Sequence, residues 1–241
     1  MATNKMLLAC ILALSFSVAL ASVVPVQDFC VADPNGISLV NGVACKDPKL
    51  VKEDDFFFSG FNKRGNTSNP MGSKVTQFNV AQIPGLNTLG VATVRLDFAP
   101  WGLNAPHMHP RASEILTVLR GTLEVGFVTS IPELRHFKKV LNKGDMFVFP
   151  IGLIHYQKNV GKRHAVAIAA FNSQNPGSIP VAATVLHAKP NIDSGIVAKA
   201  FQLDKVFVES IQSKNIAKLA ETSAEQEALD TPLHSSNETG F

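Results

Sequence analysis

The sequence has no strong excess of either charge, since 22 lysines and arginines stand against 19 aspartates and glutamates for a net charge of +3. These charges are dispersed along the chain, so we expect no basic face that would bind a polyanion, and no nucleic-acid partner. After residue 20 the sequence also lacks any apolar run long enough to cross a bilayer. No membrane span is therefore expected.

The longest apolar run lies at the start of the chain. Lys5 is followed by apolar residues from Met6 to Leu20, and the run ends in the small-residue sequence Ala19-Leu20-Ala21. A basic residue, a short apolar core and small residues make up a secretory signal peptide, which predicts that residues 1–21 are removed and that the protein is secreted. The alternative is an uncleaved anchor, although the apolar core is short for a span.

Cysteine is scarce, with three residues in 241. Cys10 lies in the predicted signal peptide, so the secreted chain would keep only Cys30 and Cys45. An oxidising compartment favours a disulfide between these two, with a pair of free thiols as the alternative. Such a bond would pin an N-terminal arm rather than staple a core, and it would contribute about 2–4 kcal/mol.

Two sequons predict N-glycosylation, one at Asn66 and the other at Asn237. Asn66 lies in the polar stretch "KRGNTSNP", whose turn-forming residues favour an exposed loop. It is therefore the preferred candidate.

From Val75 to Phe171, short runs rich in β-branched and aromatic residues alternate with turn residues. The predicted strands are residues 75–83, 90–100, 114–128, 146–150 and 164–171. This spacing indicates an all-β sandwich or barrel, which we expect as a single domain over residues 22–220. Several runs are apolar on both faces, which predicts that subunits pack against each other.

After Pro180 the pattern becomes helical, and helices are predicted at residues 181–188, at 195–201 and from about 204 onward. The last helix carries an apolar stripe made of Leu203, Val206, Phe207 and Ile211. The stripe either covers the barrel's own core or clasps a neighbouring subunit. Residues 221–241 are polar and are predicted to form a disordered tail.

The stretch "HMHPRASEIL" contains two of the chain's seven histidines. On a strand, His107 and His109 would face the same side. Glu114 has the opposite parity, but Pro110 favours a break in the strand, and a turn over residues 110–112 would bring Glu114 inward. A His-X-His pair alone is often no more than two surface histidines.

Further along, "GDMFVFPIGLIHYQKN" predicts a turn, a short strand, a second turn and another strand that begins at His155. Asn159 shares the face of His155 on that last strand. If a small barrel brings these strands together, three imidazoles and the carboxylate of Glu114 form a donor set for a divalent transition metal.

The combined string resembles both sequence motifs of the cupin superfamily. The residues that carry the resemblance are Gly102, His107, His109, Glu114, Gly121, Gly144, Pro150, Gly152, His155 and Asn159. Within that superfamily, "QDFCVAD" at residues 27–33, Cys45, "SQNPG" and "KAFQLDK" are similar to plant germin-like proteins. The resemblance extends from about Gln27 to Ala220, and the first motif departs from it at Trp101, where germins usually show a glycine.

The resemblance implies a cupin jelly-roll β-barrel with C-terminal helices and a disulfide-pinned N-terminal arm. It implies a secreted glycoprotein of the plant apoplast or cell wall, related to defence and stress, and assembled as a homohexamer, a trimer of dimers. The implied cofactor is Mn(II), bound by His107, His109, Glu114 and His155. By donor chemistry alone iron, zinc, copper and nickel also fit.

Some germins are oxalate oxidases, in which two asparagines near the metal help to bind the substrate. By resemblance, the nearer one is Asn104, whereas the farther one is replaced by Val94. A valine cannot donate hydrogen bonds to a buried dianion. Together with the bulk of Trp101, expected near the mouth of the site, this replacement predicts that oxalate is not oxidised. Asn159 is also expected near the metal or the substrate.

The favoured activity is superoxide dismutation, with which germin-like proteins are often credited. This reaction needs an accessible redox metal and a route for a small anion, but no elaborate substrate site. The alternative is a metal-stabilised cell-wall or binding protein without turnover. No catalytic residue beyond the metal ligands is assigned.

Overall fold

The computed structural model describes residues 27–36 and 42–214. The predicted signal peptide at 1–21, the predicted disordered tail at 221–241 and the sequon at Asn237 lie outside the described residues. None of the described helices is both long enough and apolar enough to cross a membrane.

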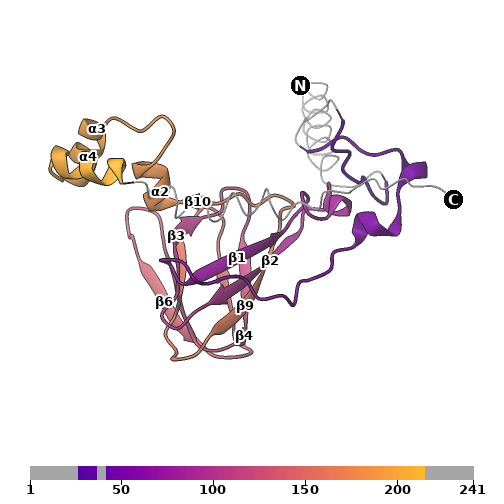
Figure 1. Cartoon of the computed structure of the whole chain (residues 1–241), viewed down its shortest axis with the longest axis horizontal. Helices are drawn as coiled ribbons and strands as arrows, with labels where there is room; N and C mark the ends of the chain where they lie inside the picture. The colour runs from indigo at the N-terminus through magenta and orange to yellow at the C-terminus, as the bar shows by residue number, and fades with distance from the viewer. Residues whose placement is uncertain (1–26, 37–41, 215–241) are drawn as a thin grey trace, which may run out of the picture.

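Two five-stranded antiparallel sheets pack against each other to form the body of the molecule (Figure 1). The first sheet has the order β1-β2-β9-β4-β7 and consists of β1 (Ser73–Phe78), β2 (Ala92–Phe98), β4 (Glu114–Arg120), β7 (Met146–Phe149) and β9 (Ala165–Phe171). The second has the order β10-β3-β8-β5-β6 and consists of β3 (Leu103–Met108), β5 (Leu123–Val128), β6 (His136–Leu141), β8 (His155–Asn159) and β10 (Ile179–Pro180). The predicted all-β jelly-roll architecture is confirmed.

The core lies between the two sheets because each strand alternates its side chains between faces. On β4, Leu116 and Val118 are buried while Ile115 and Leu119 are exposed. The alanines at 165, 167 and 169 on β9 leave room for the large inward rings of Phe98 and Phe149. The runs that read as apolar on both faces are therefore buried on only one face within a single chain.

Three details of the strand prediction need correction. The predicted strand at 114–128 is two strands, β4 and β5, which lie in different sheets and are separated at Gly121, where φ is +85°. The first strand ends at Phe78 rather than at residue 83, because the side chain of Asn79 accepts a hydrogen bond from the amide of Ala81 and starts a turn. Strand β6 was missed in the sequence. Its residues, HFKKVL, are rich in lysine because β6 is an edge strand, where charged side chains discourage pairing with other chains.

The C-terminal helices are α2 (Val181–Leu186), α3 (Ser194–Phe201) and α4 (Lys205–Ser213). Side chains of Asp193 and Asp204 accept hydrogen bonds from backbone amides in the first turns of α3 and α4, which explains where these helices begin. Figure 1 shows α3 and α4 extending away from the sheets.

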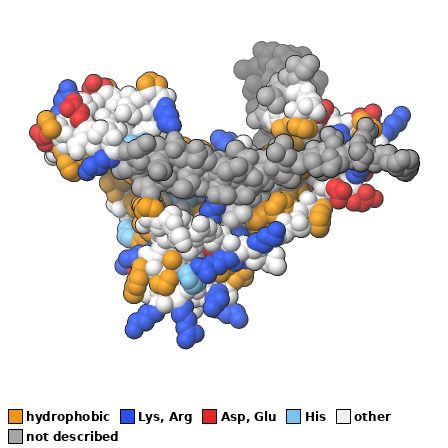
Figure 2. Space-filling view, viewed as in Figure 1, with side chains coloured by type: hydrophobic (Ala, Val, Ile, Leu, Met, Phe, Trp, Pro, Cys, Tyr) orange, Lys and Arg blue, Asp and Glu red, His pale blue; other side chains and the backbone are white. Residues whose placement is uncertain are grey.

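The apolar stripe of α4 does not cover the barrel's own core. Val206 and Phe207 are 71% and 52% exposed, and Leu203 is 42% exposed, whereas Val208 packs against α3 residues Val197 and Ala198. The first of the two interpretations of this stripe is therefore wrong for a single chain. Figure 2 shows hydrophobic side chains open to solvent on the helical extension and on the sandwich.

The N-terminal arm lies beside the sandwich, on the side away from the helices (Figure 1). The disulfide between Cys30 and Cys45 is present, as predicted. The amide of Ala32 donates to the carbonyl of Pro84, which begins the short 3-10 helix η3 (Pro84–Leu86). The arm continues through η1 (Pro48–Leu50) and η2 (Glu53–Phe56), and the ring of Phe56 packs over η3.

Candidate metal centre

Strands β3 and β8 bring two of the predicted ligands together directly. They are antiparallel neighbours, and the register pairs His107 with His155. His109 follows the last residue of β3, and its ring centroid lies 5.1 Å from that of His107. Both side chains are buried, so the two histidines face the same side of the strand, as predicted.

Glu114 reaches the same place from the opposite sheet. The chain leaves β3 at Met108, turns at Pro110 and Arg111, and enters β4 at Glu114. Because β3 and β4 belong to different sheets, the predicted turn moves Glu114 across the sandwich, and the inner face of β4 points back at the histidines. Glu114 can therefore face His107 and His109, although its position in the sequence would put it on the opposite face of a continuous strand.

The four side chains converge in the interior. His107, His109, Glu114 and His155 are 6%, 8%, 3% and 2% exposed. Each offers a ligand atom that lies within 4.8 Å of the other three. Oε2 of Glu114 lies 3.1 Å from Nε2 of His109 and 3.2 Å from Nε2 of His155. The four side chains therefore form one buried polar cluster, whose members need partners because burial removes their contact with water.

Backbone carbonyls fix the orientation of all three imidazole rings. Nδ1 of His107 contacts the carbonyl of Ala105, and Nδ1 of His155 contacts the carbonyl of Leu153, both at 2.8 Å. Nδ1 of His109 contacts the carbonyl of Gly177. A carbonyl can only accept, so each Nδ1 carries the proton, and in the neutral ring the lone pair lies on Nε2.

Three imidazoles held in this way present their Nε2 atoms to one carboxylate. If each Nε2 were protonated, three imidazolium groups would be buried together, with the rings of His107 and His155 only 4.3 Å apart between centroids. One metal cation among the four donors satisfies every group at once. The residues therefore fit a divalent transition metal, and the donor set does not choose between manganese and its neighbours.

The protonation equilibria agree with a cation site. Burial is the largest influence on His107, and together with the nearby His155 it lowers the pKa of His107 to about 4. Burial alone would raise the pKa of Glu114, but in the metal-free site hydrogen bonds from His109 and His155, which need a proton on Nε2, lower it to about 2. A bound cation would take the place of these protons. At neutral pH the site thus offers a neutral imidazole at His107 and an ionised carboxylate at Glu114, which are the ligating forms.

Gln157 and Asn104 support the carboxylate from behind. Nε2 of Gln157 donates to Oε1 of Glu114 at 3.3 Å, and Nδ2 of Asn104 donates to Oε1 of Gln157 at 2.8 Å. Asn104 is therefore linked to the ligands through one intervening side chain. The sequence reasoning missed Gln157, although its spacing of two residues from His155 on β8 places it on the same inner face.

Asn159 lies further along that face but has other partners. Its Nδ2 donates to the carbonyls of Ala99 and Arg163 at 2.8 and 2.7 Å, and its Oδ1 accepts from the amide of Gly161. These bonds hold the turn after β8 rather than a ligand, so they do not support the expected place of Asn159 beside the metal. Val94, on the inner face of β2, is 9% exposed and belongs to the apolar core.

Trp101 lies at the far end of these strands from the histidines. The amide of Asn159 donates to the carbonyl of Gly102 at 2.8 Å, whereas His107 pairs with His155 at the other end of β8. At 3.2–3.4 Å per residue, His155 and Asn159 are about 13 Å apart along the strand. Trp101 is 59% exposed and does not flank the histidines, contrary to expectation.

The backbone at Trp101 explains why a glycine suits this position. The amide of Gly102 donates to the carbonyl of Ala99, and Pro100 and Trp101 form the corners of the turn. The φ angle of Trp101 is +65°. A turn with proline at its second position and a positive φ at its third favours glycine there.

Aromatic rings close off the site. The ring of Phe149 stacks on His155 with centroids 4.5 Å apart, and the ring of Phe171 meets His109 edge to face at 4.8 Å. These apolar neighbours keep water from the ligands on that side and strengthen charge interactions within the site.

The first sequon lies in an exposed loop, as expected. Asn66 is exposed, and its Oδ1 accepts from the amide of Ser68 at 2.9 Å. Glycosylation at Asn66 remains a prediction.

The sandwich and its four-ligand centre are those of a cupin. The family model described as Cupin matches residues 59–209. Among solved structures, the chain is similar to an oxalate oxidase in complex with the substrate analogue glycolate, with 46% sequence identity and a TM-score of 0.75. That match covers 79% of this chain and 96% of the other.

Curated relatives narrow the family further. The chain is 57% identical over 215 residues to putative germin-like protein 2-1 of Oryza sativa subsp. japonica, which covers 89% of this chain and 100% of the relative. It is 59% identical over 193 residues to germin-like protein subfamily 1 member 7 of Arabidopsis thaliana, which covers 79% and 84%. The chain belongs to the germin-like proteins of the cupin family.

Proposed function

We propose that this germin-like protein is a secreted glycoprotein of the plant apoplast that binds Mn(II) through His107, His109, Glu114 and His155. The observation that carries the proposal is the set of three imidazoles whose Nδ1 atoms all donate to backbone carbonyls. Their Nε2 lone pairs are thereby directed at one buried carboxylate. Secretion is supported by the Cys30–Cys45 disulfide, which forms in oxidising compartments. We also propose the defence-related role that the family resemblance implies.

We propose superoxide dismutation as the activity. When bound, a redox-active metal would accept and return one electron, and three histidines with one glutamate leave coordination positions open for a small anion. The chain's own contribution is to hold neutral imidazoles, to orient them through the carbonyls and to position Glu114 through Gln157. The alternative within the same site is a structural metal with no turnover.

Oxalate oxidation is a second candidate because a solved structure at 46% identity is an oxalate oxidase. Val94 argues against it. This side chain is packed in the apolar core and cannot donate a hydrogen bond, so a buried oxalate would lose its hydration without replacement on that side. Asn104 alone remains of the expected asparagine pair, and its amide already donates to Gln157.

We propose that the protein assembles as a homohexamer, a trimer of dimers. Outward side chains of the first sheet are exposed in a single chain, with Met146 at 56% and Val148 at 53%. The stripe of α4 is exposed as well, with Val206 at 71%. Apolar surface of this kind is typical of subunit interfaces, and it agrees with the clasping role that the sequence left open for α4.

The catalytic proposal is tested with purified, glycosylated protein loaded with manganese. We expect dismutation of superoxide that disappears, together with the bound metal, in Glu114→Ala. Activity that persists in the metal-free variant would contradict the assignment. Metal binding that stabilises the protein without any turnover would favour the structural alternative.

The oxalate candidate needs a separate assay, the release of hydrogen peroxide from oxalate by the native protein and by Val94→Asn. We expect no release by the native protein. Robust release would show that the interpretation of Val94 is wrong.

A further inference from the structure

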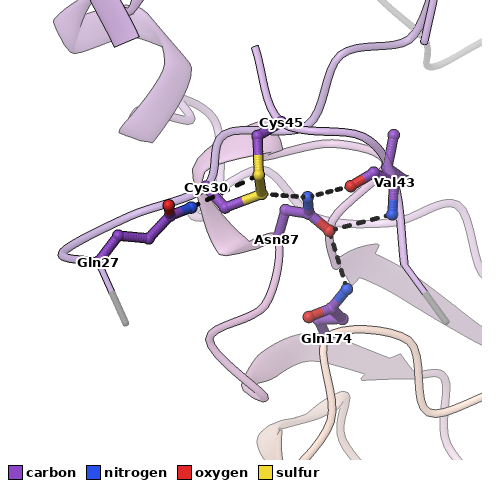
Figure 3. Close-up of a disulfide and its surroundings, with 6 residues drawn as sticks. All are labelled: Gln27, Cys30, Val43, Cys45, Asn87 and Gln174. Atoms are coloured by element: carbon purple, nitrogen blue, oxygen red, sulfur yellow. Dashed lines mark hydrogen bonds between the residues drawn. A yellow bond between two sulfur atoms is a disulfide. The ribbon is translucent and has the colours of Figure 1, made fainter. Parts of the chain in front are cut away.

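The Cys30–Cys45 disulfide is tied into the sandwich by one buried amide. The side chain of Asn87 is completely buried, and its Nδ2 donates to Sγ of Cys30 at 3.3 Å and to the carbonyl of Val43 at 2.7 Å (Figure 3). Its Oδ1 accepts from Nε2 of Gln174 at 3.0 Å. One side chain thus contacts the disulfide, the loop that the disulfide closes, and a residue 87 positions further along the chain.

Gln174 belongs to the segment after β9 that reaches the metal centre. In this segment, residues 172–178, the carbonyl of Gly177 accepts from Nδ1 of His109. Asn175 accepts two hydrogen bonds from Arg111, through its carbonyl at 2.9 Å and through its side chain at 3.1 Å. The segment therefore contacts the disulfide network at Gln174 and orients a metal ligand three residues later.

We propose that the Asn87–Gln174 amide pair couples the state of the Cys30–Cys45 disulfide to metal binding at His109, with Gln174 acting as a positioning residue. This inference rests on the proposed metal-binding function. It adds a thiol-sensitive site, the disulfide itself, and a route by which that site acts on the metal.

The two sulfurs differ in their access to solvent. Cys45 is exposed and Cys30 is 4% exposed, so an external thiolate reaches Sγ of Cys45. A new S–S bond forms at Cys45, and the original bond breaks with its electron pair on Sγ of Cys30, where the N–H of Asn87 stabilises the thiolate. The second thiolate of a dithiol then displaces Cys45. The dithiol supplies both electrons and becomes a cyclic disulfide.

Loss of the bond removes the covalent link that closes the loop holding Val43, and leaves this loop held by backbone hydrogen bonds from Asp33 to Ala44 and from Lys46 to Val31. The disulfide joins residues separated by 15 positions, and Val43 lies inside that loop. With the loop less constrained, the carbonyl of Val43 is a less fixed acceptor for Asn87, while Cys30 becomes a charged one, so the hydrogen bond between Asn87 and Gln174 changes. Groups that orient metal ligands from behind typically alter metal affinity by about 10–100-fold when they are removed.

The experiment is a cycle of four proteins, each loaded with Mn(II): native, Gln174→Leu, the double variant Cys30→Ser with Cys45→Ser, and the combination of all three changes. The measurement is the rate of Mn(II) release into excess chelator, followed by the paramagnetic resonance signal. We expect release to be about tenfold faster in Gln174→Leu and in the serine variant, and the combination to differ from either by less than about twofold.

The matched control is Gln27→Ala. Gln27 also donates to the disulfide, through Nε2 to Sγ of Cys45 at 3.5 Å, but within the described network it makes no contact with the metal-site segment (Figure 3). We expect native release rates from this variant. Circular dichroism of each protein excludes global unfolding. If the serine variant fails to fold, mild reduction of native protein and of Gln174→Leu replaces it, with the same expected outcome.

Two results would overturn the coupling. One is a release rate in the native protein that does not change when the disulfide is lost. The other is an effect of disulfide loss that is equally large with and without the Gln174 side chain. A native protein that retains no Mn(II) would instead overturn the proposed function, and the coupling with it.

Discussion

The metal centre and the α3–α4 extension differ in how complete they are within one chain. At the metal centre, Glu114 and His155 are almost fully buried, and their polar atoms are positioned by backbone carbonyls and by Gln157. On α4, Val206 and Phe207 are exposed although they form an apolar stripe. One chain can therefore build the site, whereas the helices need a further surface to bury their apolar side chains.

The largest effect is expected when the metal centre loses a ligand. His155→Ala removes one of the four donors, and the affinity for Mn(II) should fall by at least about a hundredfold, since even groups behind the ligands are worth 10–100-fold. Metal content after dialysis, measured by mass spectrometry, checks this. The control is His136→Ala, which removes an exposed histidine of β6 and should leave metal content unchanged. Retention of metal by His155→Ala would show that the four side chains are not the site.

Acid should destabilise the metal-free protein because it protonates His107. His107 has a folded-state pKa of about 4 against an ordinary value of 6.5. Between these values the unfolded chain binds more protons, so stability falls as the pH drops from 6.5 to 4. Over this interval the free energy of unfolding should fall by about 3 kcal/mol. Denaturant unfolding of metal-free protein across this range measures it.

Bound metal should reduce this acid sensitivity, because it occupies the lone pair that a proton would take. The Glu114 carboxylate, with a pKa of about 2, adds a further loss only below its ordinary value of 4.5. A metal-free protein equally stable at pH 6.5 and pH 4 would contradict the account of His107.

Substitutions on the apolar stripe of α4 should change the assembly of the protein but not its metal binding. Val206→Asp with Phe207→Asp places charges on the exposed stripe, and loss of their apolar contacts should weaken association by about 2 kcal/mol or more for each interface. Light scattering should show smaller particles, with metal content unchanged. Lys205→Asp changes the net charge by the same two units in the same turn but outside the stripe, and it serves as the control. Native-sized particles from the double variant would show that α4 faces solvent in the assembly.

The smallest effect is expected at Trp101, which lies near the end of β8 opposite His155. Its φ of +65° is costly for a side chain with a Cβ. Trp101→Gly should therefore stabilise the protein by about 0.5–1 kcal/mol after allowance for the greater freedom of glycine in the unfolded chain. Thermal unfolding measures the gain. Trp101→Ala keeps the strained φ and should show no gain, and neither change should alter metal binding.

Much of this molecule follows from local sequence pattern. The alternation along β4 and β9, the turns before β8, and the aspartates that begin α3 and α4 act within a few residues of one another. Their positions were predicted to within a few residues, except that β4 and β5 were predicted as a single strand. Strand β6 escaped prediction because an edge strand carries lysines in place of an apolar pattern. Gln157 was missed although its spacing of two residues from His155 places it on the inner face of β8; the sequence does not show that it contacts Glu114 on the opposite sheet.

The cluster of His107, His109, Glu114 and His155 was set by the sequence through the motif spacing, and the disulfide through the scarcity of cysteine. The tertiary structure decided what each neighbour does. Gln157 supports the carboxylate, Asn159 holds a turn, and Asn87 links the disulfide to Gln174. Trp101 lies near Asn159, at the other end of β8 from His155. The physical reason is the distance along the chain over which each kind of interaction acts. Strand parity and turn chemistry act between adjacent residues, whereas these contacts join segments that meet only when two sheets pack together.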